Sequence, residues 1–532
     1  MQRLRTSVDQ GASAYVDNRQ EMERALAEVQ AHVGQALGGG GQKYVDRHRE
    51  RGRLLPRERI ELLVDIGSPM IELSPLAAVG TGFPTGGSVV TAIGVVEGAE
   101  CMLIASDPTV RGGAINPISV TKILRAMDIA RENRLPLLFL VESGGADLPS
   151  QGEFYLRGGN QFRHLTQMSA MGVPTVALVF GNATAGGAYV PGMCDYTILI
   201  KDQSKVFLGG PPLVKMATGE ESDDETLGGA EMHARDSGLC DYLADDEVDC
   251  IRLARQIISH LGWRKLGPEP GPVVEPLEDA GDLLGIASAD PKVPFDIREL
   301  LARIVDGSEF DEFKPYYGQA LLTGWARIHG YLVGILANKQ GVLFNEESEK
   351  AAQFIQLANQ MDQPLIFIHN CTGFMVGAEY EKRGIVKDGA KLINAVANST
   401  VPHIALMAGA SYGAGNYGMS GRPFNPRFAF SWPTARVAVM GGTQLAGVLS
   451  IVARQSALAQ GKPFDEDADA TMRQSIEAQI EDESTALYNT ARIYDDGIID
   501  PRDTRHVLGM ALSATHSAEV RGVKGGYGVF RM

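Results

Sequence analysis

The chain has 532 residues, more than one hydrophobic core usually supports, and we predict two domains, residues 1–275 and residues 276–532. A formal net charge of −16, without a concentrated excess of Lys and Arg, argues against a nucleic-acid partner, and no long apolar run indicates a membrane partner. The five cysteines lack CxxC spacing, so we expect no metal and a reducing, cytoplasmic compartment, with the mitochondrial matrix left open.

Helices and strands alternate along the first half of the sequence. Apolar residues recur at helical spacing in some segments, whereas short apolar runs bounded by glycine predict strands. Such alternation is typical of an α/β layer with parallel strands. The predicted elements are helices over residues 18–37, 118–133 and 245–261, a strand pair within residues 88–106, a loop at residues 107–113, and strands over residues 137–141 and 173–180.

A glycine-rich turn follows the last of these strands. Residues 181–189 are small up to Ala188, so a ligand could approach the backbone amides with no side chain in the way. A turn that opens a helix also directs unpaired N–H groups at anionic atoms. We call residues 181–189 the first amide turn.

The same pattern occurs a second time. Residues 401–417 match residues 173–189 at an offset of 228, and further upstream Gly330 matches Gly98 at an offset of 232. A four-residue difference in the intervening segment accounts for the change in offset. We therefore predict two copies of one fold, and we call residues 409–417 the second amide turn.

The second half repeats the plan of the first. Residues 267–276 are rich in Pro and Gly, form the clearest linker, and set the boundary between the predicted domains. The elements expected after it are strands within residues 325–337, 365–369 and 404–407, helices over residues 346–361 and 391–397, a largely helical segment past residue 435, and a final tail at residues 528–532.

Residues 43–59 form the densest basic cluster of this acidic chain. One interpretation is a solvated helix face with ion pairs between successive turns. The other is a phosphate site, because planar guanidinium groups match the geometry of phosphate oxygens. The sequence leaves both open, and Arg51 and Arg53 are the candidate ligands.

The familiar acid–base motifs are absent, since the sequence contains no GxSxG, HExxH or GxxxxGK[ST] pattern. Amide turns can catalyse without ionisable side chains, because one preorganised oxyanion donor lowers a barrier by about 2.7–4 kcal/mol. Glu142 could act as a base at the end of its strand, but its counterpart is Asn370, and a salt-bridged loop acid is an equal interpretation. His233 is interpreted as a packed histidine. Lys215 lacks the flanks of a biotinylated lysine.

Six stretches together resemble the carboxyltransferase (β) subunits of biotin-dependent acyl-CoA carboxylases, and the methylcrotonoyl-CoA carboxylase branch is the most similar. The resemblance implies two tandem crotonase-like α/β domains, each a ββα superhelix, in a homohexamer. It also implies an active site between the N-terminal domain of one subunit and the C-terminal domain of a neighbour. The stretches are residues 142–149, 184–191, 210–215, 373–377, 387–391 and 411–419.

The resemblance also implies a role for each turn. The acyl-CoA would lie against the first turn, and biotin, delivered by a separate α subunit with biotin carboxylase and carrier functions, against the second. The cofactor would supply the base that the side chains lack. Carried over by position, the catalytic residues are Gly186, Gly187, Ala414 and Gly415; the substrate-binding residues are Gly145, Ala146, Ala185, Arg51 and Arg53; and the cofactor-binding residues are Gly373, Phe374 and Gly413.

The sequence predicts the acyl chain of the substrate less sharply than it predicts the family. Asn416-Tyr417-Gly418 differs from the Ala-Tyr-Asp pattern of propionyl-CoA carboxylases and favours 3-methylcrotonoyl-CoA, whereas the glycine-rich segment at residues 151–166 leaves a longer chain such as geranyl open. Propionyl-CoA stays an alternative. So do a biotin-independent hydratase or isomerase that uses Glu142 as its base, and a structural subunit without catalysis.

Overall fold

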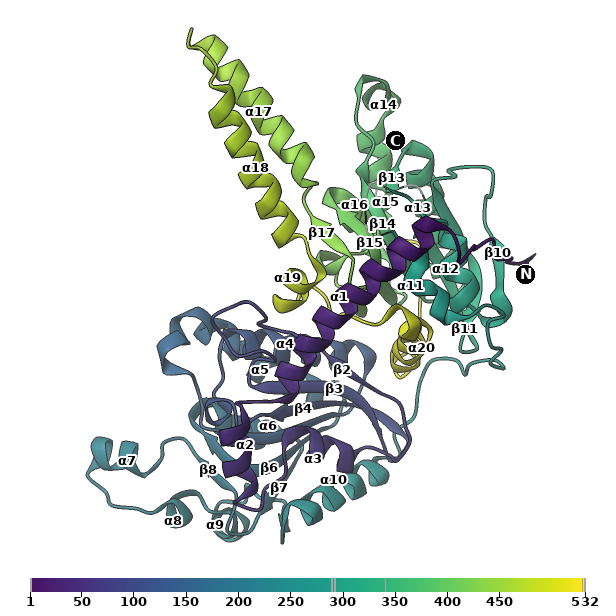
Figure 1. Ribbon diagram of the computed structural model, residues 1–532. Coiled ribbons are helices and arrows are strands. Elements are labelled where there is room, and N and C mark those ends of the chain that lie inside the picture. Colours follow the sequence, from purple (N-terminus) through teal and green to yellow (C-terminus); the bar gives the residue numbers. More distant parts are fainter. Residues whose placement is uncertain (1, 289, 291–292, 340, 529, 531–532) are drawn as a thin grey trace.

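The computed structural model describes residues 2–288, 290, 293–339, 341–528 and 530. Figure 1 shows two lobes, each built around one β-sheet, with a long helical hairpin projecting from the second lobe. No helix of the described residues is long and apolar enough to cross a membrane. Part of the tail predicted at residues 528–532 lies outside the described residues.

The first lobe is organised by a sheet of eight strands among the described residues, in the order β2-β3-β4-β5-β6-β7-β9, with β8 paired to β6. The strands β4 to β7 pair in parallel, as the alternating sequence pattern predicts. The bounds are β2 (Met70–Leu73), β3 (Val89–Val96), β4 (Ala99–Ser106), β5 (Leu137–Ser143), β6 (Thr175–Thr184), β7 (Tyr196–Ile200), β8 (Lys205–Phe207) and β9 (Tyr242–Ala244).

The second lobe repeats this topology. Its sheet has nine strands among the described residues, in the order β1-β10-β11-β12-β14-β15-β16, with β13 paired to β14 and β17 paired to β15. The bounds are β1 (Gln2–Arg3), β10 (Glu309–Glu312), β11 (Leu321–Ile328), β12 (Tyr331–Asn338), β13 (Gly341–Leu343), β14 (Leu365–Phe374), β15 (His403–Tyr412), β16 (Phe428–Ser431) and β17 (Arg436–Ala438).

The helices cover the two sheets and connect their strands (Figure 1). α1 (Ser13–Leu37) spans the two lobes. The helices of the first lobe are α2 (Gln42–Arg49), α3 (Pro56–Leu63), α4 (Pro117–Asn133), α5 (Gln151–Ala170), α6 (Tyr189–Met193), α7 (Pro211–Thr218), α8 (Asp224–Gly228), α9 (Ala230–Met232) and α10 (Glu247–Leu261). Those of the second are α11 (Leu283–Ile286), α12 (Ile297–Ile304), α13 (Asn345–Gln360), α14 (Ala378–Arg383), α15 (Ile385–Asn398), α16 (Gly413–Gly418), α17 (Gly442–Ala459), α18 (Glu466–Glu483), α19 (Ala486–Ala491) and α20 (Thr504–Thr515).

Equivalent buried side chains make the duplication visible in detail. Lys122 Nζ donates to the carbonyl of Val89 at 2.8 Å, and Lys350 Nζ donates to that of Leu321 at the same distance. Burial lowers the pKa of both lysines to about 8. The carboxylate of Asp65 accepts from the main-chain N–H groups of the turn between β3 and β4, as another aspartate does between β11 and β12. The offset read from the sequence therefore reflects two copies of one fold.

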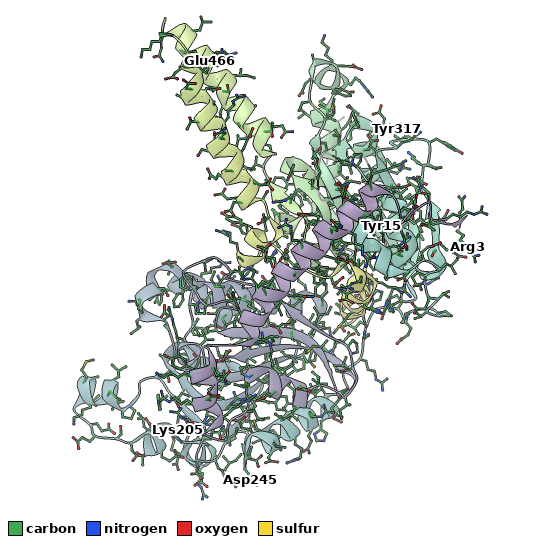
Figure 2. All side chains as sticks on the ribbon, in the orientation of Figure 1. Arg3, Tyr15, Lys205, Asp245, Tyr317 and Glu466 are labelled. Atoms are coloured by element: carbon green, nitrogen blue, oxygen red, sulfur yellow. The ribbon has the colours of Figure 1, made fainter. Side chains whose placement is uncertain are left out.

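The N-terminal segment joins the two lobes. β1 pairs with β10 of the second sheet, and α1 runs from the second lobe to the first (Figure 1). Tyr15, marked on α1 in Figure 2, lies beside Asp282, and Gly40 beyond the end of α1 donates to Thr109 Oγ1 at 3.0 Å. The linker region also contacts the second lobe, because the N–H of Gly267 donates to a carbonyl of α20's C-terminal end. A domain boundary at residue 275 stays a prediction.

A buried ion pair fixes the lobes against each other. The Arg125 guanidinium on α4 donates to both carboxylate oxygens of Asp496 at 2.7 Å. It also donates to the carbonyls of Pro426 and Arg427 before β16. An ion pair this well satisfied is costly to break from one side, by about 3–5 kcal/mol. The amide turns of one chain therefore keep a fixed relative position.

Candidate active site

The first amide turn is built where two neighbouring strands of the first sheet end. β6 runs into a 3-10 turn at Ala185–Ala188, where Ala185 has a φ of +55°. Gly145, just beyond β5, has a φ of +98°, and a Cβ added to it would lie 3.3 Å from the carbonyl oxygen of Thr184. The structure thus brings Gly145 and Ala146 together with Ala185, Gly186 and Gly187, although the N–H of Gly145 already donates to Ser143 Oγ at 3.2 Å.

The second amide turn has the same construction with tighter packing. β15 runs into α16, and Gly413 at the junction has a φ of +52°. A Cβ added to Gly415 would lie 2.5 Å from Cys371 Sγ and 3.2 Å from the Cα of Gly373, whose own φ is +131°. Only glycine fits at position 415, so the backbone itself approaches the end of β14. Gly373, Phe374, Gly413, Ala414 and Gly415 are therefore neighbours.

Each turn presents the start of a helix, whose first N–H groups have no partner within the helix. Such groups, together with the helix dipole, stabilise an oxyanion and need no ionisable side chain. The two turns can therefore hold two electron-rich oxygen atoms, one in each lobe.

A basic cavity of about 380 Å³ lies beside the first amide turn. Its walls include Arg47, Arg51 and Arg53 on one side and the ends of β5 and β6 on the other, through Gly144 and Gly181. Arg51 is exposed, whereas Arg53 is anchored by a 2.8 Å hydrogen bond to the carbonyl of Phe180. The sequence left open whether this cluster is a solvated face or an anion site, and its place beside the turn favours an anion site.

Glu142 lies in a network of ion pairs. Its carboxylate contacts Arg59 at 2.8 Å and Arg53 at 3.3 Å, and Arg59 also binds Glu247 through two nitrogens. Gly181 leaves room for it, since a Cβ there would lie 2.8 Å from Glu142 Oε1. One carboxylate oxygen of Glu142 therefore faces Arg53 and the other faces Arg59. The geometry favours the interpretation of Glu142 as a structural acid.

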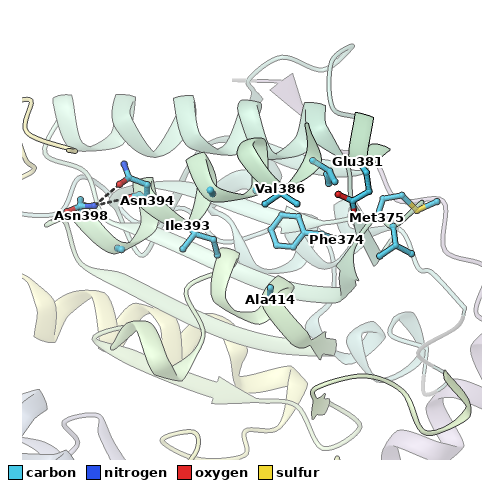
Figure 3. A pocket seen from close by; sticks show the side chains of 13 residues that line it. Phe374, Met375, Glu381, Val386, Ile393, Asn394, Asn398 and Ala414 are labelled. Atoms are coloured by element: carbon cyan, nitrogen blue, oxygen red, sulfur yellow. Dashed lines mark hydrogen bonds between the residues drawn. The ribbon is translucent and has the colours of Figure 1, made fainter. Parts of the chain in front are cut away.

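Two cavities reach Ala414 in the second amide turn. One is an apolar groove of about 690 Å³ along α15, which extends from Met375 and Glu381 past Phe374 and Ala414 to Asn394 and Asn398 (Figure 3). The other, of about 920 Å³, lies between Ala414 and Tyr417 and the base of the α17–α18 hairpin. Neither shares a lining residue with the basic cavity of the first lobe.

Sequence reasoning missed two features of this region. The base of the hairpin, through Val439 and Met440, forms one wall of the larger cavity. Ser411 and Asn416 lie inside the second turn, where Asn416 Nδ2 donates to Ser411 Oγ at 2.7 Å. The offset of 228 could have identified this pair, because it aligns Ser411 and Asn416 with Ala183 and Ala188.

His233 and the cysteines, the other candidates from the sequence, have the surroundings of residues that serve the fold. His233 Nε2 lies 2.7 Å from the carbonyl of Val206 and its Nδ1 lies 2.6 Å from Ser237 Oγ, which fits a packed histidine. The five cysteines are free thiols. Within the part of the chain that the structure describes, no group of three or more His, Cys, Asp or Glu is placed to hold a metal ion.

Comparison with known proteins gives a consistent result. The carboxyl transferase domain model matches residues 47–524. A probable biotin-dependent acyl-coenzyme A carboxylase beta2 subunit of Mycobacterium tuberculosis is 63% identical over 99% of this chain and 100% of its own length. A biotin-dependent 3-methylcrotonyl-coenzyme A carboxylase beta1 subunit of the same organism is 48% identical over 96% of this chain and 97% of its own.

A solved structure extends this likeness to the fold. The β subunit of geranyl-CoA carboxylase from P. aeruginosa superposes with a TM-score of 0.91 at 41% identity, over 99% of both chains. This agreement confirms the fold class predicted above, two crotonase-like α/β units in tandem. The chain therefore belongs to the carboxyl transferase family and is one of the β subunits of acyl-CoA carboxylases.

Proposed function

We propose that this chain transfers a carboxyl group from biotin, carried by a separate α subunit, to an acyl-CoA. The proposed acceptor is 3-methylcrotonoyl-CoA or a related branched or longer enoyl-CoA such as geranyl-CoA. The observation that carries the proposal is the pair of equivalent amide turns, one beside a basic cavity and one beside apolar cavities.

The first lobe would bind the CoA ester. The N–H groups of Gly186 and Gly187 would donate to the thioester oxygen, which gains negative charge when the acyl group loses a proton. Gly145, Ala146 and Ala185 would shape the turn around it. Arg51 and Arg53 line the adjoining cavity and would bind the CoA phosphates, because guanidinium groups suit phosphate geometry.

The second lobe would hold the biotin head group. Gly415 packs so closely on Gly373 that the turn presents bare backbone, and the N–H groups of Ala414 and Gly415 suit a urea oxygen. Gly413 and Phe374 would complete the surface. When bound, the cofactor supplies the carboxyl group and the base. The chain's own residues would bind and orient the reactants. No side-chain base is then needed, which agrees with the ion pair that holds Glu142.

We propose that each complete site forms between two copies of the chain. β8 pairs with β6 at the first turn and β17 pairs with β15 at the second, and each short strand leads into a helix with exposed apolar side chains. On α7 the exposed fraction of Met216 is 78%, and on α17 that of Ile451 is 58%. Figure 2 marks Glu466 near the outer end of the hairpin, far from the body of its own lobe.

Such apolar surfaces are usually covered in an assembly. Pairing the first lobe of one copy with the second lobe of another would cover α7 and α17 together. It would also place the two kinds of amide turn beside each other. A homohexamer built from such pairs, in the cytoplasm or the mitochondrial matrix, is the assembly that we propose.

The direct test is ATP-dependent carboxylation with a panel of acyl-CoAs. The chain would be mixed with its α subunit, bicarbonate and ATP, and the products measured by mass spectrometry. We expect carboxylation of 3-methylcrotonoyl-CoA or geranyl-CoA and weaker reaction with propionyl-CoA. No carboxylation of any acyl-CoA by a correctly assembled complex would refute the proposal.

The alternative, a biotin-independent hydratase or isomerase, depends on Glu142 as its base. We expect Glu142→Gln to keep ATP-dependent transfer within about threefold once the oligomer is confirmed, because the carboxylate serves ion pairs with Arg53 and Arg59. Hydration of an enoyl-CoA without biotin, abolished in this variant, would favour the alternative.

A further inference from the structure

The second amide turn contains a side-chain hydrogen bond that closes across it. Ser411 is on β15 and Asn416 is on α16, so the bond from Asn416 Nδ2 to Ser411 Oγ, 2.7 Å long, spans Gly413, Ala414 and Gly415. Both side chains are buried, with exposed fractions of 0% for Ser411 and 8% for Asn416.

A buried histidine completes the arrangement from the neighbouring strand. His369 Nδ1 on β14 lies 2.8 Å from Ser411 Oγ. The Ser411 hydroxyl accepts from Asn416 and also lies within hydrogen-bond distance of His369 Nδ1, and the direction of this second bond depends on the imidazole tautomer. Burial lowers the pKa of His369 to about 4, opposed by contact with the backbone of Met419, so the imidazole is neutral at pH 7.

The packing around Asn416 leaves its side chain little freedom. The N–H of Gly421 donates to the carbonyl of Asn416 at 2.8 Å, and a Cβ added to Gly421 would lie 1.9 Å from Asn416 Oδ1. The Asn416 amide therefore fills the space that a side chain at 421 would need. His369, Ser411 and Asn416, which we call the polar clasp, thus connect β14, β15 and α16.

The first lobe has no such clasp. At the offset of 228, the clasp residues correspond to Val141, Ala183 and Ala188, which are all buried and apolar. Burying three polar side chains costs free energy, which the two hydrogen bonds to Ser411 offset only in part because His369 Nε2 has no hydrogen-bond partner among the residues that the structure describes. The fold forms an amide turn without the clasp in one lobe, so the clasp must serve something specific to the second turn.

We infer that the polar clasp positions the backbone N–H groups of Ala414 and Gly415 for the neutral urea group of biotin. The inference depends on the function proposed above. A CoA ester has several phosphates to fix its place, whereas a urea head group is uncharged, so its alignment depends on how rigidly the amides are held. His369, Ser411 and Asn416 are positioning residues that act through the turn.

The test replaces the clasp by the residues of the first lobe. The variants are Asn416→Ala, and the triple variant His369→Val, Ser411→Ala and Asn416→Ala. Biocytin, the biotin–lysine conjugate, serves as the carboxyl acceptor, and a carboxylated acyl-CoA as the donor: the carboxyl carbon leaves the acyl carbon, which gains a proton, and bonds to the biotin nitrogen, which loses one. We expect the KM for biocytin to rise about tenfold, as the loss of a buried hydrogen bond predicts, with the KM for the CoA ester unchanged.

Two measurements separate positioning from general destabilisation. Hydrogen exchange of the peptide covering residues 413–419 should accelerate in both variants, and calorimetric titration should show weaker biocytin binding without any turnover. The matched control is His403→Thr, which removes a buried histidine bound to Ser420 and Ser399 at the opposite end of β15 and restores the residue type of the first lobe, Thr175. It should lower stability and leave the KM for biocytin unchanged.

The outcomes are distinct. If the wild type binds and carboxylates biocytin but the triple variant keeps the wild-type KM and exchange rate, the clasp has no positioning role. If the KM values for biocytin and the CoA ester rise equally, its role is general and the inference is wrong. If the wild type neither binds biocytin nor transfers to it, the function proposed above fails first.

Discussion

The two amide turns share a backbone design but differ in what surrounds them. Beside the first turn, the equivalent cavity wall contains Glu142 and Gly144 together with three arginines. Beside the second, the matching positions are Asn370 and Thr372, and the cavity of about 750 Å³ is closed by the α17–α18 hairpin through Gln444, Glu477 and Glu481.

This difference in charge would allow one fold to serve the two ligands proposed above. The backbone turn supplies the same N–H donors in both lobes, and those donors select only an electron-rich oxygen. The segments around each turn would then select the rest of each ligand: α2 and its neighbours bring positive charge to the first lobe, and the hairpin brings acidic and apolar side chains to the second. In this proposal the duplicated core would supply the chemistry, and the segments around each turn would supply specificity.

The largest effect is expected from adding charged residues to α17 of the α17–α18 hairpin. Ile451→Asp with Val452→Asp places two carboxylates on the apolar face of α17, where these side chains are exposed in one chain. If that face is covered by the first lobe of another copy, the oligomer should dissociate and transfer should fall more than about a hundredfold. Light scattering and the transfer assay check this, with Arg454→Asp on the same helix as a control. An intact, active oligomer would contradict the cross-subunit site.

Filling the first turn comes next in size. A Cβ added to Gly187 would meet no heavy atom of the described residues within 4 Å, so Gly187→Val should fold normally. The valine side chain would then occupy the space of the thioester oxygen. We expect kcat/KM to fall by about a hundredfold or more, because the loss of one oxyanion donor typically raises a barrier by about 2.7–4 kcal/mol. Gly415→Val should also abolish transfer, but with a lower melting temperature, because of the contact with Cys371 Sγ. Full activity in both variants would refute the assigned roles.

Two buried histidines of the second lobe, His369 and His403, should make its stability sensitive to acid. Burial lowers the pKa of His403 to about 3 and that of His369 to about 4, whereas the equivalent residues of the first lobe, Thr175 and Val141, do not titrate. The folded state binds fewer protons than the unfolded state, so this stability is fully present above pH 6.5 and is lost as the pH falls toward 4.

His403→Thr should therefore flatten the dependence of stability on pH. Each histidine contributes a slope of at most about 1.4 kcal/mol per pH unit in this window. Urea unfolding at pH 7.0, 6.0 and 5.0 measures it, and the variant should lose less stability than the wild type on acidification. An unchanged slope would mean that His403 titrates alike in the folded and unfolded protein, and it would contradict the lowered pKa.

The sequence predicted most of the framework and the location of both turns. The periodic segments at residues 118–133 and 137–141 agree with α4 and β5 within two residues, because glycine and proline mark their ends. The repeat at an offset of 228 predicted that Gly186 and Gly187 would correspond to Ala414 and Gly415. Local patterns of this kind predict structure well because each residue's neighbours in the sequence are also its neighbours in the turn.

What the sequence could not predict depends on contacts distant in the chain. The pairing of β1 with β10 joins residues about 300 positions apart, and nothing in Gln2 or Arg3 indicates it. The hairpin was predicted only as helical, since an exposed apolar face resembles a buried one in sequence. Glu142 stayed ambiguous until the structure placed Arg53 and Arg59 against it.

The smallest effect tests the charge difference between the two cavities. Arg51 lines the basic cavity, and Arg51→Ala should raise the KM for the CoA ester by up to about tenfold while kcat is unchanged, because an exposed guanidinium contributes to binding before and during the reaction alike. Dephospho-CoA esters should show a smaller effect if Arg51 binds the ribose phosphate. The matched control is Arg49→Ala on α2, whose side chain pairs with Glu58 at 2.7 Å. Equal KM values in both variants would place the CoA phosphates elsewhere, and the charge difference between the two cavities would then not act through Arg51.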